Sequence, residues 1–204
     1  MQIIESQYFG CVNYWISISK NSLNEILLYD RYQKMTFCNR TVIVGSNGLI
    51  DLSIPIEGGR NCGLIFKDVK MDVSQNWKQR HWKSILSSYG KAPFFEFYRS
   101  DVERLIFSND IYLFDYNYKI ILWVLKILKL KTSFTIETEE NDKTTLFQKA
   151  VNIYRPSNFQ EKTYNYQYVQ VFENKLSFQY NVSILDLIFC EGSSANNLLI
   201  SADL

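Results

Sequence analysis

One histidine, His81, is the first residue of this chain that could do chemistry. A catalytic imidazole needs a dry site and a partner that fixes its tautomer and its pKa, and Gln79, Tyr89 or a carboxylate brought in by the fold could be that partner. The alternative is a core histidine that is hydrogen-bonded to a backbone carbonyl. Because a lone histidine has no diagnostic spacing, the residues by themselves favour the core interpretation.

The segment 32–40, YQKMTFCNR, is the second candidate, since it gathers amide, ammonium and guanidinium groups in a predicted loop. Such groups can fork onto a carboxylate or a phosphate, and functional residues often lie on loops held by a sheet. An ordinary polar connection explains the same composition equally well. Cys38 would need a base and a positive environment to act as a nucleophile, and His81 is the only imidazole, so we expect an inert buried thiol.

Composition and motifs exclude several classes of function. The 22 basic and 21 acidic residues leave a net charge of +1, which gives no sign of a nucleic-acid partner. A single histidine excludes a multi-histidine metal site, and the cysteines match no zinc spacing, so we expect neither a metal nor a cofactor. The N-terminus lacks a secretory signal, and the most apolar stretch, 120–130, is too short to span a bilayer. We therefore expect a cytoplasmic protein without a membrane span.

Hydrophobic periodicity predicts the elements that must position these residues. Apolar runs and period-two alternation predict strands at 25–29, 69–73, 133–137 and 168–172, and a hairpin of 41–44 with 50–56 around Asn47-Gly48. A four-residue period predicts three central helices at 77–89, 94–108 and 115–131, the last with Asp115 as its N-cap. Ser183, in a pattern with Asp186 that resembles a capping box, begins a short C-terminal helix that Gly192 ends.

The 204 residues therefore predict one α/β or α+β domain, 1–204, whose mixed sheet contains the N-terminal strand and the hairpin. The charged segment 139–143 is the best loop candidate, and the tail 193–204 is expected to be frayed. Tyr164, Tyr166 and Tyr168 alternate as in a strand. They could stack on sugar or base rings, but a packed sheet edge is the favoured interpretation.

Three blocks of the sequence together resemble the WbqC-like protein family in its short form. The blocks are YQK (32–34) with Asn39-Arg40 and LSIPI (52–56), then WKQRHW (77–82) with SYGKAPFFE (88–96), then NVSILDLIF (181–189) with Glu191-Gly192. The resemblance runs from about Gln7 to Gly192. This chain departs from the family's opening Gln-Pro-Tyr-Phe-Pro, because Ser6-Gln7-Tyr8-Phe9-Gly10 lacks the prolines. The family is named for a protein encoded among O-antigen polysaccharide genes, so the resemblance implies a link to surface glycans.

The resemblance also implies site residues. It assigns catalysis to His81 as acid or base and to Asp186 as the group that orients a partner, and substrate binding to Gln33, Asn39, Arg40 and Tyr89, with Asn39 and Arg40 on an anionic group. The implied function is a transferase-type enzyme of surface polysaccharide and glycan precursor biosynthesis, with an anionic small-molecule or nucleotide-linked substrate. The alternative is a non-catalytic binding or scaffold protein with a protein partner. Convergence of His81 and Arg40 on one pocket favours the enzyme, whereas a packed His81, an exposed Arg40 and an aromatic surface patch favour the scaffold.

Overall fold

A computed structural model describes residues 2–59, 63–137 and 154–203 of the chain. The strands within these residues are β1 (Gln2–Ile4), β2 (Leu23–Ile26), β3 (Arg40–Gly45), β4 (Gly48–Ser53) and β5 (Ser133–Ile136). The helices are α1 (Val12–Ser19), α2 (Trp77–Tyr89), α3 (Phe95–Ile106), α4 (Leu113–Leu128), α6 (Glu173–Leu176), α7 (Ile184–Glu191) and α8 (Ala195–Ser201), with short 3-10 turns η2 (Phe66–Asp68) and η4 (Gly192–Ser194). The predicted mixed α/β class is confirmed.

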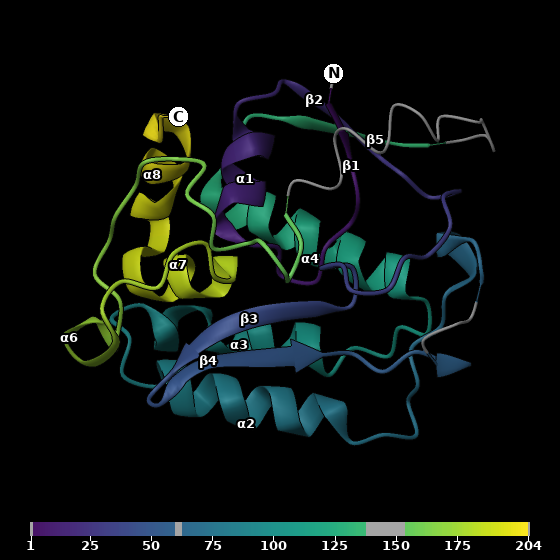
Figure 1. The fold of residues 1–204 in the computed structure, drawn as a ribbon, viewed down its shortest axis with the longest axis horizontal. Coiled ribbons are helices and arrows are strands. Elements are labelled where there is room, and N and C mark those ends of the chain that lie inside the picture. Colours follow the sequence, from purple (N-terminus) through teal and green to yellow (C-terminus); the bar gives the residue numbers. More distant parts are fainter. Residues whose placement is uncertain (1, 60–62, 138–153, 204) are drawn as a thin grey trace.

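The strands form two separate sheets, so the predicted single mixed sheet that contains both the N-terminal strand and the hairpin is wrong. One is a parallel sheet in the order β1-β2-β5, and the other is the antiparallel hairpin β3-β4. In the parallel sheet, Ile26 of β2 is aligned with Ile4 of β1 and Ile136 of β5. Helix α1 makes the crossover from β1 to β2, and the chain returns to β5 only after the hairpin and α2 to α4 (Figure 1). Because the three strands run in the same direction, the residues that follow them lie at one edge of the sheet.

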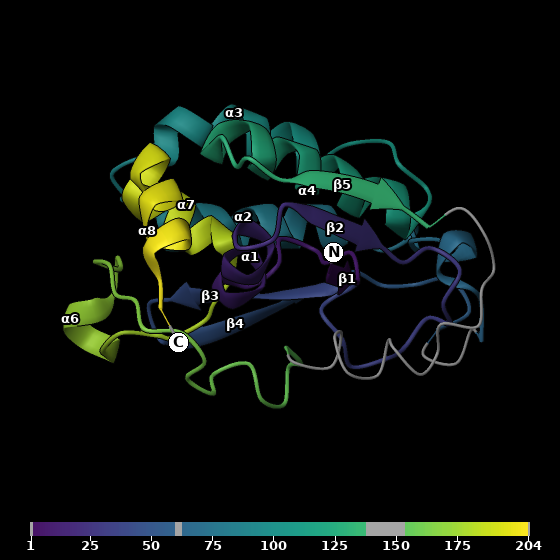
Figure 2. The same cartoon turned by 90° about the horizontal axis from the view of Figure 1, so that it is seen from above.

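Helices cover the hairpin on two sides. Figure 1 shows α2 along one side of β3 and β4, with α1 and α7 on the other. Figure 2 shows α3 and α4 next to each other in a layer on the opposite side of the molecule from the hairpin. The largest side chains that are fully buried between these elements are aromatic, among them Trp15, Trp77, Tyr8 and Tyr89. The many aromatic residues of the sequence therefore build the core.

The central helices are confirmed, but their ends differ from the prediction. Tyr112 is the N-cap of helix α4, and Asp115 lies in the first turn of this helix. The predicted capping role of Asp115 is therefore wrong. Ser183 is the N-cap of α7, as predicted, and its side chain accepts a hydrogen bond from the backbone N–H of Leu185. The capping-box partner is wrong, because the Asp186 side chain bonds to Tyr168 and Gln170 instead.

Several strand predictions need correction. The predicted strand 25–29 is β2, which begins earlier at Leu23 and ends at Ile26. The hairpin is confirmed, but Gly45 pairs with Gly48, so Ser46 and Asn47 make the turn. Neither Ser46 nor Asn47 has a positive φ, whereas the predicted Asn-Gly turn needs two such residues; Gly48, with a φ of 125°, is already the first residue of β4. The segments 69–73 and 168–172 are not strands; the first makes only isolated bridges and the second leads into α6.

The C-terminal tail is ordered into a helix rather than frayed. Residues 195–201 form α8, in which Ala195 and Leu199 are fully buried. The alternating tyrosines do not form a strand, and the ring of Tyr166 stacks on that of Tyr180 with centroids 4.9 Å apart. The predicted loop 139–143 lies outside the described residues. Among the helices that the structure describes, none combines the length and the apolar character needed to cross a membrane.

Candidate functional site

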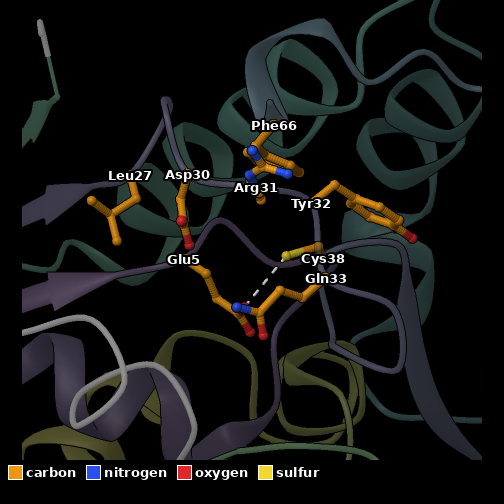
Figure 3. A pocket seen from close by; sticks show the side chains of 8 residues that line it. All are labelled: Glu5, Leu27, Asp30, Arg31, Tyr32, Gln33, Cys38 and Phe66. Atoms are coloured by element: carbon orange, nitrogen blue, oxygen red, sulfur yellow. Dashed lines mark hydrogen bonds between the residues drawn. The ribbon is translucent and has the colours of Figure 1, made fainter. Parts of the chain in front are cut away.

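A narrow cleft lies at the carboxyl edge of the parallel sheet, where open α/β sheets commonly bind ligands. Glu5 follows β1 directly and Leu27 follows β2 directly, so the two strands place their next residues side by side. The cleft is shown in Figure 3 and is lined by Glu5, Leu27, Asp30, Arg31, Tyr32, Gln33, Cys38 and Phe66. Its interior volume is about 20 Å³, which is room for one water-sized group. A larger molecule would therefore place one small substituent inside and the rest at the mouth.

Glu5 is the group in this cleft best suited to proton transfer. Its side chain is 8% exposed, and its carboxyl oxygens accept hydrogen bonds from Gln7 Nε2 at 3.1 Å and from Cys38 Sγ at 3.5 Å. Burial raises the pKa of Glu5 to about 7, and these two hydrogen bonds and the Arg155 guanidinium offset only part of that rise. A carboxyl group with a pKa near neutrality can both take up and release a proton at physiological pH.

Cys38 is held as a neutral thiol. Burial, and then the negative charge of Glu5, raise the pKa of the Cys38 thiol well above its usual value. A reactive cysteine needs the opposite shift, because the thiolate is the nucleophile. The expectation of an inert buried thiol therefore agrees with the geometry, in which the S–H group donates to the Glu5 carboxylate. The neighbour of Cys38 is a carboxyl group, whereas the sequence suggested only an imidazole.

Gln33 is the predicted site residue that reaches the cleft. It lies on the exposed loop after β2, and its Oε1 accepts a hydrogen bond from Arg155 Nη2 at 2.9 Å. Arg155 also lowers the pKa of Glu5 through its charge. Gln33 and Glu5 approach from opposite sides in Figure 3. Gln33, Glu5 and Arg155 come from distant parts of the sequence and thus meet at one site.

Asn39 and Arg40 do not line the cleft. Asn39 is buried, and its Nδ2 donates to the carbonyl of Ile54 at 2.8 Å, which fixes the loop to the end of the hairpin. Arg40 begins β3 and forms an ion pair with Asp51, with Nη1 and Oδ2 3.3 Å apart. The two adjacent residues therefore have separate partners, and the predicted joint anchor for an anion is not assembled in this structure.

His81 is packed with both ring nitrogens in use. Nε2 lies 3.2 Å from the Ser53 carbonyl oxygen, which can only accept, so Nε2 carries the proton. Nδ1 then accepts from the Tyr8 hydroxyl at 2.9 Å. Burial lowers the pKa of His81 to about 4, which keeps the ring neutral at physiological pH. This arrangement favours a positioning role for His81, which holds Tyr8 three residues beyond Glu5, over the predicted acid–base role.

His81 also borders a shallow depression between β4 and α2, with a volume of about 430 Å³. Asp51 and Arg80 line the same depression, and Arg40 reaches it only through its ion pair with Asp51. His81 and Arg40 therefore do not face one another across a shared pocket. The convergence of these two side chains on one pocket, which would favour the predicted His81–Arg40 site, is not found among the described residues.

Tyr89 and Asp186 form part of a buried polar network away from the cleft lining. Both side chains are fully buried. The Tyr89 hydroxyl accepts from the backbone N–H of Val44 at 3.2 Å, and Asp186 Oδ2 accepts from Tyr168 at 2.7 Å and Gln170 at 2.8 Å. Burial raises the pKa of Asp186, and bonds from Tyr168, Tyr89 and Gln170 offset it in part. The network joins α2, β3 and α7, so it supports the fold around the hairpin.

A carboxyl group follows each of the three parallel strands. Glu5 follows β1, Asp30 lies four residues beyond β2, and Glu137 follows β5. One oxygen of Glu137 accepts from the backbone N–H groups of Leu28 and Tyr29 at 3.2 and 3.1 Å. Glu137 thereby fixes the turn that carries Asp30 into the cleft. Among the described residues, no three histidine, cysteine or acidic side chains are grouped so that they could hold a metal ion.

The residues that the sequence analysis missed are Glu5, Asp30 and Arg155. The signal for Glu5 was weak, since β1 is only three residues long and shows no alternation that could be recognised. Asp30 directly follows the predicted strand 25–29 without any further signal, and Arg155 has no local pattern around it. These residues come together only because β1 and β2 are neighbours in the sheet and because the chain passes close to the cleft again at Arg155. A local sequence pattern carries no information about either arrangement.

A model of the WbqC-like protein family matches residues 5–158 of the chain. No curated protein and no solved structure matches the chain. The matched range includes the cleft residues and His81, whereas the block 181–192 and Asp186 lie beyond it.

Proposed function

The chain belongs to the WbqC-like protein family, and on this premise we propose that it is a cytoplasmic transferase-type enzyme of surface polysaccharide and glycan precursor biosynthesis. The reacting groups meet in the cleft beside Glu5. The observation that carries this proposal is the Glu5 carboxyl group, which is buried, lines a cleft at the carboxyl edge of a parallel sheet and has its pKa raised to about 7. Perturbed carboxyl groups in clefts are typical of acid–base catalysis.

Glu5 serves as the proton carrier of the transfer. As a hydroxyl or amino group of the acceptor attacks the donor, Glu5 takes up the proton that this group loses. The bond between the transferred group and the leaving atom then breaks, and Glu5 returns the proton to the leaving atom. Such a carboxyl group typically contributes about 10²–10⁴-fold to the rate.

Substrate binding uses the mouth of the cleft. Arg31 lines the cleft and Arg155 lies close enough to act on Glu5, so an anionic or nucleotide-linked substrate can place its charge there. Gln33 orients the substituent that enters, through the amide group that Arg155 already holds. His81 acts on the site through Tyr8, and Asn39 through the loop that carries Cys38. Arg40, Tyr89 and Asp186 support the hairpin and the helices that pack on it.

A scaffold function is the second candidate, and two observations favour it. His81 is packed, with 4% of its surface exposed, as that function predicts. Phe97 on α3 is 79% exposed and Phe94 just before α3 is 38% exposed, so two aromatic side chains at this end of α3 face solvent. Because neither observation explains a buried carboxyl group in a cleft, the transferase is the better supported function.

A thermal-shift screen against nucleotides, nucleotide sugars, amino acids and acyl donors tests the proposal. A ligand at about 100 times its Kd raises stability by roughly 2.7 kcal/mol, or roughly 5–10 °C in Tm for a chain of this size. We expect a hit that Gln33→Ala weakens and that Asp51→Asn, a matched change outside the cleft, leaves unchanged. Donor and acceptor hits incubated together should give a product by mass spectrometry, with a rate about 10²–10⁴-fold lower in Glu5→Gln. A hit with no turnover, equally strong in all variants, would favour the scaffold.

A further inference from the structure

Two of the polar residues that line the cleft, Glu5 and Asp30, carry carboxyl groups. The Gln33 amide also lines it, and its oxygen accepts from Arg155. The charge of Asp30 raises the pKa of Glu5, and the Arg155 guanidinium lowers it. In Figure 3 the Asp30 side chain points toward Glu5, whereas the Arg31 guanidinium lies beside Phe66. Two carboxyl groups therefore lie at the interior of the cleft, and the Arg31 guanidinium lies at its side.

The size of the interior limits what can enter. Its volume of about 20 Å³ admits one water-sized group, and Leu27 and Phe66 contribute apolar walls. A group of this size that carries positive charge and three donors is a primary ammonium. A hydroxyl group has one donor and no charge, so it would not match the charge of the two carboxyl groups.

We propose that this cleft is the subsite for the primary amine of an amino sugar, bound as an ammonium by Glu5 and Asp30 and oriented by Gln33. This assignment rests on the proposed transferase function and names its acceptor. Once bound, the ammonium gives one proton to the Glu5 carboxylate. The nitrogen keeps the electron pair of that N–H bond and becomes a neutral amine, which is the nucleophile that a transfer requires. Arg31 at the side of the cleft takes an anionic part of the same substrate.

The test is binding of glucosamine to the full chain, measured by thermal shift and calorimetry slightly above neutral pH. N-acetylglucosamine is the matched control ligand, since it has the same ring without the positive charge, and methylammonium tests the amine alone. We expect saturable binding of glucosamine and methylammonium and none of N-acetylglucosamine. Glu5→Gln and Asp30→Asn should each weaken glucosamine binding about ten- to a hundred-fold, the range expected when a charged hydrogen bond is lost. Glu96→Gln, which neutralises an exposed carboxylate on α3, should leave it unchanged.

The outcomes separate this inference from the proposed function. Equal binding of both sugars, or glucosamine binding that survives Glu5→Gln and Asp30→Asn, overturns the amine subsite. If nucleotide-linked ligands still bind and still depend on Gln33, the transferase proposal stands without it. A circular dichroism spectrum and an unfolding transition of the free Glu5→Gln variant show whether a loss of binding reflects a loss of fold. Asp30→Asn, on a half-buried loop position, gives the same readout where Glu5→Gln does not fold.

Discussion

Replacing Glu5 by glutamine should make the protein more stable at alkaline pH. Burial raises the pKa of Glu5 from its ordinary value of 4.5 to about 7, so the folded state favours the protonated form. Its contribution to stability is therefore complete below about pH 4.5 and is lost as the pH rises through about 7. At 1.36 kcal/mol for each pKa unit, the full loss is about 3.4 kcal/mol, and about 2.5 kcal/mol of it falls between about pH 5 and pH 8.5.

The groups that face Glu5 set the sign of this effect. Cys38, Gln7 and Arg155 stabilise the carboxylate, and Asp30 destabilises it, but burial outweighs them. Glutamine fills nearly the same volume and does not titrate. The advantage of Glu5→Gln over the wild type should therefore grow by about 2.5 kcal/mol across this pH range.

Urea unfolding of the wild type and Glu5→Gln at the two pH values measures this difference directly. Glu96→Gln on α3 is the matched control, because the Glu96 side chain is 74% exposed. Loss of its charge should change the free energy of unfolding by the same small amount at both pH values. Carbon-13 NMR of the Glu5 carboxyl group gives the pKa independently. The opposite result is a difference in unfolding free energy between the wild type and Glu5→Gln that changes by less than about 0.5 kcal/mol between the two pH values. In that case Glu5 titrates normally, and the argument for a proton carrier in this cleft is refuted.

Three further predictions concern the elements around the site. The NMR signals of His81, the sole histidine, should show the Nε2–H tautomer and no protonation above about pH 5, because burial lowers its pKa to about 4; a midpoint near 6.5 would contradict the packed arrangement. Ser183→Ala should lower the free energy of unfolding by about 1–2 kcal/mol, since Ser183 caps α7 and donates to the Phe9 carbonyl at 2.9 Å; an unchanged urea midpoint would exclude this capping role. Gly192→Ala should cost about 1–3 kcal/mol in the same assay, because Gly192 has φ of 59° and a Cβ there would lie 2.6 Å from the Phe94 ring; a neutral substitution would show that the turn can relax.

The elements predicted well from the sequence are those with a long and regular pattern. Helix α2 has the predicted bounds, because one apolar side recurs over 13 residues before Gly90. Helix α1 was missed, since it has only eight residues and six of them are buried, which leaves only Ser17 and Ser19 to mark a polar side. The segment 69–73 alternates in sequence, but Val73 is 63% exposed and no strand pairs along it. Alternation thus predicts a strand only where a partner strand is present to use it.

The site was harder to predict than the fold because its residues meet through strand order. Gln33 was recognised from its neighbours in sequence, and it does reach the cleft. Glu5 had no comparable signal, since a single carboxylate after two isoleucines is ordinary until β1 is placed parallel to β2. That placement removes the carboxylate from water and puts Cys38 and Asp30 beside it, and these surroundings create its chemistry. His81 shows the converse, because the same kind of burial uses both of its nitrogens and leaves no lone pair for a substrate. The side chain that looks reactive in the sequence, His81, is thus the one already hydrogen-bonded in the fold, and the proton carrier that we propose, Glu5, is the one whose pKa burial raises to about 7.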